Sequence, residues 1–140
     1  MSASNIERFD QLAGRIFADL YEAFPLPKTL SDISHGEKGL DPVFNAEFFF
    51  VATVRWLASS GYVTHGKQDN RFVFEDCVLT AKGLEVLKAT PDSLTESSIG
   101  SQLQDAAKSG LVDSVKTLVG KALAIGAAKG YTAAAAWISS

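Results

Sequence analysis

Cysteine is nearly absent from this chain of 140 residues: Cys77 is the only one, so no disulfide can form within it. A lone thiol is more often a buried side chain than a nucleophile, and no histidine or asparagine stands with it in a recognisable catalytic motif. We therefore expect Cys77 to be a buried thiol on a strand. Histidine is equally scarce, because His35 and His65 are the only two. With no ligands at metal-binding spacing, the sequence predicts no metal site and no other cofactor.

An excess of positive charge is also missing, since 13 Lys and Arg residues stand against 16 Asp and Glu residues, for a net charge of −3. Proteins that bind nucleic acid usually carry a basic face, which this composition does not indicate. No stretch approaches the roughly twenty apolar residues that a transmembrane helix needs, and the opening MSASNIERFDQ has no apolar signal core. We therefore expect a protein of the bacterial or phage cytoplasm rather than a membrane protein.

The motifs of common enzyme classes are absent as well. The chain has no glycine-rich phosphate loop and no nucleophile elbow. Glu75 and Asp76 are adjacent on an expected strand, where neighbouring side chains point to opposite faces, so they are a poor acid–base pair. These absences favour a protein that is not an enzyme, and no small-molecule ligand is evident.

Two segments show the periodicity of helices. Apolar residues recur at steps of three and four over residues 6–21, and Ser4 or Asn5 can cap the helix that this pattern predicts. Residues 43–60 are rich in aromatic side chains, and their run Phe48–Val51 is strand-like when taken alone. The length of the apolar pattern favours a helix there too. Because three adjacent aromatics cover more than one side of a helix, we expect it to pack on its own domain and also against something else.

The chain between Gly61 and Gly83 has the pattern of a β-ribbon that passes into a helix. Gly61 can adopt the left-handed turn that ends a helix. Two strand-like runs, residues 62–64 and 71–74, flank a polar loop, and we expect the first to pair with the second. Thr80 can cap the following helix, in which Gly83 permits a neighbour to approach closely. The side chains expected in the core are Phe9, Leu12, Ile16, Leu20, Phe48, Val51, Val54, Leu57, Val63, Phe72, Phe74, Leu79, Leu84 and Leu87.

Two phrases of this segment carry a resemblance to a known superfamily. Residues 57–63 (LASSGYV) have the form of a recognition helix that passes into a wing, and residues 79–83 (LTAKG) that of a wing that passes into the next helix. Over about residues 6 to 89 the chain resembles the winged helix-turn-helix superfamily, including MarR-like and PadR-like regulators. The resemblance implies an α+β fold whose third helix enters the DNA major groove and whose wing touches phosphate. On that basis the candidate nucleic-acid contacts are Asn45, Arg55, His65, Lys67 and Arg71.

The residues at the expected DNA-reading position depart from the pattern of that superfamily. The expected start of the third helix, residues 41–47, contains the acids Asp41 and Glu47 and no Arg or Lys. Residues 1–95 contain nine Lys and Arg against thirteen Asp and Glu, a net charge of −4. Because phosphate contacts dominate DNA affinity, we expect a non-catalytic protein-interaction or assembly module. The alternative is a DNA-binding transcriptional regulator of the winged-helix type.

A break at residues 90–93 divides the chain into an expected winged-helix domain, residues 1–92, and a helical extension, residues 93–140. The extension is rich in Ala and Gly, and we expect it to be helical from about residue 98 to 137 with a break near Gly110. Its small side chains bury little area, so we expect it to dock on the same chain or on a second copy. We expect the partner to be another protein or a second copy of the chain rather than DNA. The candidate packing interface consists of Leu111, Val115, Leu118, Val119, Gly126 and Gly130.

Overall fold

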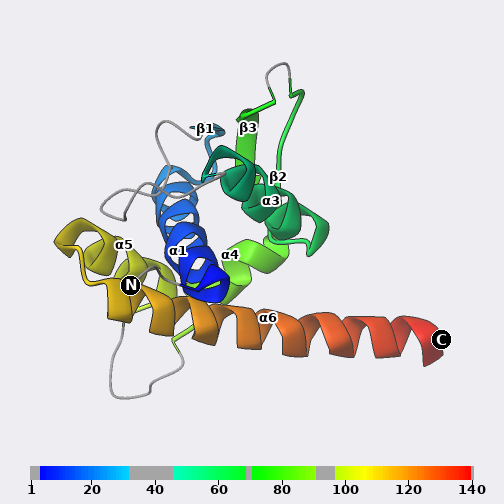
Figure 1. Cartoon of the computed structure of the whole chain (residues 1–140). Coiled ribbons are helices and arrows are strands. Elements are labelled where there is room, and N and C mark those ends of the chain that lie inside the picture. Colours follow the sequence, from blue (N-terminus) through cyan, green and yellow to red (C-terminus); the bar gives the residue numbers. More distant parts are fainter. Residues whose placement is uncertain (1–3, 32–45, 69–70, 91–96, 140) are drawn as a thin grey trace.

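The computed structural model of the chain describes residues 4–31, 46–68, 71–90 and 97–139. Within these ranges helices combine with a small antiparallel sheet, in agreement with the expected α+β class. Figure 1 shows how the elements are arranged. The elements are α1 (Asn5–Ala23), β1 (Lys28–Ser31), α3 (Ala46–Ser59), β2 (Val63–Thr64), β3 (Val73–Leu79), α4 (Ala81–Lys88), α5 (Ile99–Ser109) and α6 (Val112–Ser139).

The three strands pair in the order β1-β3-β2, with β3 in the centre. Leu30 of β1 pairs with Phe74 in the first half of β3, whereas Val63 of β2 pairs with Leu79 at its end. The expected pairing of the first strand of the ribbon with residues 71–74 is therefore wrong. β3 is longer than the expected strand and runs to Leu79, so its end lies beside β2, while β1 pairs along the opposite edge of β3.

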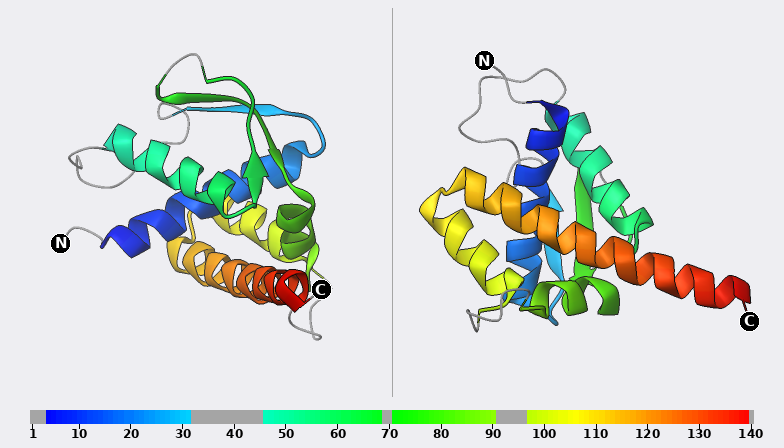
Figure 2. Two further views of the ribbon diagram at one scale, coloured as in Figure 1. Left: turned by 90° about the vertical axis from the view of Figure 1, so that its right-hand side faces the viewer. Right: turned by 90° about the horizontal axis from the view of Figure 1, so that it is seen from below.

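α1 is the central element of the fold. Ser4 caps it by accepting a hydrogen bond from the Glu7 amide nitrogen at 3.2 Å, as its sequence predicts. In Figure 2 the sheet and α3 lie on one side of α1, and α4, α5 and α6 lie on the other. α1 contacts elements of both groups, so its buried residues cover more than one face.

The segment that joins α3 to α4 has the local geometry that its residues predict. Gly61 has a φ of 86°, a left-handed conformation that ends the helix. The hydroxyl oxygen of Thr80 accepts a hydrogen bond from the Gly83 amide nitrogen at 3.0 Å and so caps α4. A Cβ atom at Gly83 would collide with the carbonyl oxygen of Tyr62, which confirms the expected close approach.

Most of the expected core side chains are buried, and the run Phe48–Val51 is helical as expected. Phe48 itself is a wrong prediction, because 47% of it is exposed. Its neighbour Phe50 takes the core position and is fully buried, while the Phe48 ring contacts Phe72 edge-on at 5.5 Å. Expected core residues that are only partly buried and pack against the core are Phe9, Phe72 and Leu84.

The C-terminal residues are helical with the expected break, since Gly110 ends α5 in a left-handed conformation with a φ of 70°. Val115, Leu118 and Val119 are buried in the same hydrophobic core as α1. Leu111 is a wrong prediction, because 54% of it is exposed. It lies in the short link before α6 begins, where the helical stripe has not yet started. The expected boundary at residues 92 and 93 lies outside the described residues.

The first half of α6 docks on its own chain. At Gly126, an added Cβ would lie 2.6 Å from Cε1 of the Tyr62 ring, so the helix backbone approaches this ring closely. The surroundings of Gly130 lie outside the described side chains. Beyond Gly126 the helix continues to Ser139 and extends away from the rest of the molecule (Figure 1).

Candidate functional site

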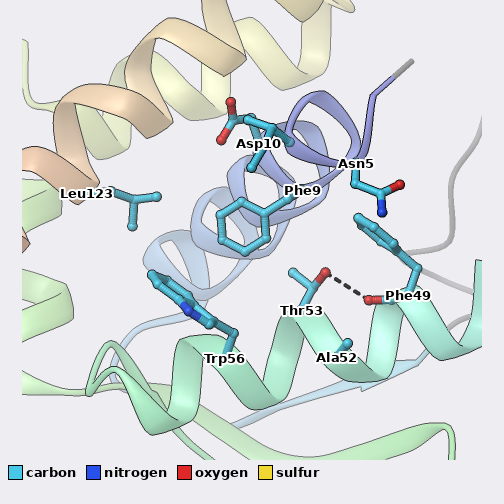
Figure 3. A pocket seen from close by; sticks show the side chains of 9 residues that line it. Asn5, Phe9, Asp10, Phe49, Ala52, Thr53, Trp56 and Leu123 are labelled. Atoms are coloured by element: carbon cyan, nitrogen blue, oxygen red, sulfur yellow. Dashed lines mark hydrogen bonds between the residues drawn. The ribbon is translucent and has the colours of Figure 1, made fainter. Parts of the chain in front are cut away.

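One feature available for binding is an apolar groove of about 550 Å³. It lies where α1, α3 and α6 approach one another, next to the point at which α6 leaves the body of the molecule. Figure 3 shows the side chains that line it. These are Asn5, Ile6, Phe9, Asp10, Phe49, Ala52, Thr53, Trp56 and Leu123.

Helical periodicity explains why these residues share one surface. Phe49, Ala52, Thr53 and Trp56 of α3 follow the spacing i, i+3, i+4 and i+7, which places them on one face of a helix. The core face of the same helix is a different one, formed around Phe50. α3 therefore packs on its own domain through one face, as expected, and its second apolar face lines the groove; that this second face packs against something else stays a prediction.

The aromatic walls of the groove are held by ring contacts. The Trp56 ring stacks on Tyr62 at 6.2 Å and meets the edge of Phe9 at 5.3 Å, yet 46% of Trp56 remains exposed. The Arg8 guanidinium lies 4.0 Å from the centre of the Phe49 ring. These contacts fix the rings before any partner arrives, which lowers the entropic cost of binding.

Polar groups in the groove are few. The Thr53 hydroxyl donates to the Phe49 carbonyl oxygen at 2.8 Å, so its proton is used inside α3 (Figure 3). Asp10 supplies the one ionisable side chain of the lining. Burial raises the pKa of this carboxyl group, and the nearby charge of Lys116 opposes the shift. The site is therefore an apolar surface with one carboxyl group.

The candidate nucleic-acid contacts are divided between two elements. Arg55 is exposed on α3, and Asn45 lies outside the described residues. Lys67 and Arg71 are exposed in the connection between β2 and β3. In the same connection the His65 ring packs edge-on against Phe74 at 5.0 Å.

Acidic side chains accompany the basic residues of this connection. Glu75 and Asp76 are exposed on β3, and the Glu75 carbonyl oxygen accepts a hydrogen bond from the Gly66 amide nitrogen at 2.8 Å. Asp76 lies against Gly66 as well, because a Cβ added there would be 2.9 Å from a carboxylate oxygen of Asp76. The Asp76 carboxylate thus lies close to the backbone beside Lys67 and opposes its positive charge.

The groove was not among the sites that the sequence predicts. The sequence predicts Phe9 in the core and Trp56 as one residue of an aromatic helix, and Leu123 is distant from both in the sequence. One signal was present: α3 has apolar residues on two faces, so one face can line a groove where the core covers the other. The other wall comes from α6, whose position depends on tertiary packing.

Cys77 is a fully buried thiol on β3, as expected. Burial raises the pKa of this thiol to about 11. A backbone hydrogen bond with Leu30 lowers the pKa in part, and the charge of Asp76 adds a smaller increase. We expect folded protein at about pH 8 to resist alkylation by iodoacetamide, because the thiolate is the reactive form. Mass spectrometry would measure this, with protein in urea as the reactive control.

The same shift makes stability depend on pH. The pKa of Cys77 is about 9 in the unfolded chain and about 11 in the folded one. Its contribution to the free energy of unfolding is therefore fully present below about pH 9 and is lost as the pH rises towards about 11. The difference in unfolding free energy between wild type and Cys77→Ala should shrink over that window in urea titrations. A constant difference, together with rapid alkylation of folded protein, would contradict the assignment.

Comparisons of the chain with protein-family models, curated proteins and solved structures find no match. Among the described residues, no group of three or more His, Cys, Asp or Glu side chains is placed to hold a metal ion. None of the described helices has the length and apolar character required to cross a membrane. The geometry of the groove is therefore the basis for inferring function.

Proposed function

We propose that this chain is a non-catalytic winged-helix protein that acts as a protein-interaction module, and that it binds an apolar helical segment in the groove of α1, α3 and α6. The observation that carries the proposal is the groove itself, with Trp56 held by Tyr62 and Phe9 while almost half of it is exposed. The order of α1, α3, the β2–β3 ribbon and α4 supports the winged-helix assignment.

The chemistry of the lining favours a helix as the bound element. An extended peptide must find partners for its backbone hydrogen bonds, and the groove offers few, since Thr53 is already bonded to Phe49. A helix satisfies its own backbone and presents side chains at i, i+3, i+4 and i+7. The carboxyl group of Asp10 would favour a basic residue at the edge of the bound helix.

A displayed library of helical peptides tests this proposal. Peptides selected on the wild-type protein should carry apolar residues at helical spacing. Ala52→Arg, which places a charge in the groove, should weaken their binding at least about tenfold in calorimetric titrations. Ala81→Arg is the matched control, because Ala81 is an exposed alanine on α4 outside the lining. Peptides that bind Ala52→Arg as well as wild type would refute the proposal.

A titration with duplex DNA separates this function from that of a regulator. At about 150 mM salt we expect only weak binding without sequence preference, because residues 1–95 carry a net charge of −4 and the Asp76 carboxylate lies against Gly66, next to Lys67. Fluorescence anisotropy with labelled duplexes measures it. Sequence-specific binding in the nanomolar range, weakened by Arg55→Ala or Arg71→Ala, would favour the regulator instead.

A further inference from the structure

α6 is longer than the surface on which it packs. Val119 and Ala122 are fully buried, and Gly126 lies against the Tyr62 ring. Thirteen more residues follow up to Ser139, which at a rise of 1.5 Å per residue extend the helix by about 20 Å. Figure 1 and the right-hand view in Figure 2 show this part projecting from the body.

The sequence of the projecting part is suited to a contact with another protein surface. It is mostly Ala and Gly, with Lys129 as its single charged residue and with Tyr131, Trp137 and Ile138 as its large side chains. A short helix gains little stability in water without tertiary packing. Trp is enriched where two proteins meet, because it buries a large area.

The projecting end cannot enter the groove of its own chain. Leu123, which lines the groove, and Trp137 both belong to the continuous helix α6. Fourteen residues separate them, which is about 21 Å along the helix axis. One molecule therefore carries both an apolar groove and an apolar helix end, and the continuous helix α6 keeps the two apart.

We propose that a second copy of the chain occupies the groove, with Trp137 and Ile138 of each copy bound in the groove of the other. This inference rests on the proposed function, since it names the helix that the groove binds. Two α6 helices would run antiparallel. Gly130 lies midway, seven residues from both Leu123 and Trp137, and would be the crossing point. Both contacts then form at once in a closed two-fold dimer.

The small residues near Gly130 fit this arrangement. At a crossing formed by glycine and alanine, two helix backbones can approach more closely than large side chains allow. The same residues bury too little area to hold the dimer by themselves. The binding free energy would then come from the two ends, where Trp137 and Ile138 meet the rings of Phe9 and Trp56.

Light scattering of the full chain over a range of concentrations up to the order of 100 µM tests the inference. Wild type should show twice the mass of a single chain. Trp137→Ala and Ala52→Arg should each raise the dimer dissociation constant at least about tenfold, because each breaks both symmetric contacts. Ala81→Arg should remain dimeric, and circular dichroism should show the helices of all three variants intact.

A mixing experiment tests that the contact is reciprocal. Trp137→Ala keeps an intact groove, and Ala52→Arg keeps an intact helix end. An equimolar mixture can form a heterodimer with one working contact, so it should associate more strongly than either variant alone and more weakly than wild type. A mixture that associates no better than its components would overturn the inference.

Other outcomes separate this inference from the proposed function. A strictly monomeric wild-type chain that still binds the selected peptides would overturn the dimer and leave the proposed function standing. A dimer that neither Trp137→Ala nor Ala52→Arg weakens would overturn the inference as well. A groove-dependent dimer that a peptide of residues 120–140 dissociates would support it.

Discussion

Replacing Phe17 with alanine should lower the free energy of unfolding by about 3–5 kcal/mol. Phe17 is fully buried on α1, the helix that contacts elements on both sides of the fold. Its ring also meets Tyr62 edge-to-face at 5.8 Å. The substitution removes the aromatic contact and leaves a cavity that the surrounding helices can fill only in part. Urea titration followed by circular dichroism would measure the loss.

Phe48→Ala is the matched control for this prediction. It deletes the same atoms, but 47% of Phe48 is exposed, and its ring contact is with Phe72 at the margin of the core. We expect a loss of about 1 kcal/mol or less, since little apolar area leaves water at this position. Equal losses at Phe17 and Phe48 would show that α1 does not form the centre of the core.

Gly83→Ala should destabilise the protein by about 2–4 kcal/mol, although alanine is the better helix former. The added methyl group would collide with the Tyr62 carbonyl oxygen, a backbone atom that cannot rotate away. That oxygen also accepts hydrogen bonds from the Thr80 amide nitrogen at 3.0 Å and from its hydroxyl at 3.1 Å. Displacing it would therefore disturb the cap of α4 as well as the turn after α3.

The same substitution in α6 should have the opposite sign. Gly120 is exposed, and a Cβ added there would have no neighbour within 4 Å. Gly120→Ala should therefore stabilise the protein by about 0.5–1 kcal/mol through helix propensity alone. Thermal and urea unfolding of the two variants would test the pair. A neutral or stabilising Gly83→Ala would contradict the close approach of α4 to Tyr62.

Features that depend on neighbouring residues could be predicted from the sequence. The cap by Ser4, the left-handed turns at Gly61 and Gly110 and the cap by Thr80 all appear as expected. Each depends on hydrogen bonds or φ angles within a few residues, where side-chain chemistry is decisive. The helical state of Phe48–Val51 also followed, because the apolar pattern around it was long.

Features that depend on which surfaces meet could not be predicted in this way. The sequence alone determined the caps at Ser4 and Thr80, where two helices of this protein begin, and the turns at Gly61 and Gly110, where two others end. Tertiary structure decided that Phe50 rather than Phe48 enters the core, that β2 pairs with the end of β3 while β1 takes its other edge, and that Leu123 joins Trp56 in one groove. The helical period predicts which residues share a face, but the packing of the whole chain decides which element that face contacts.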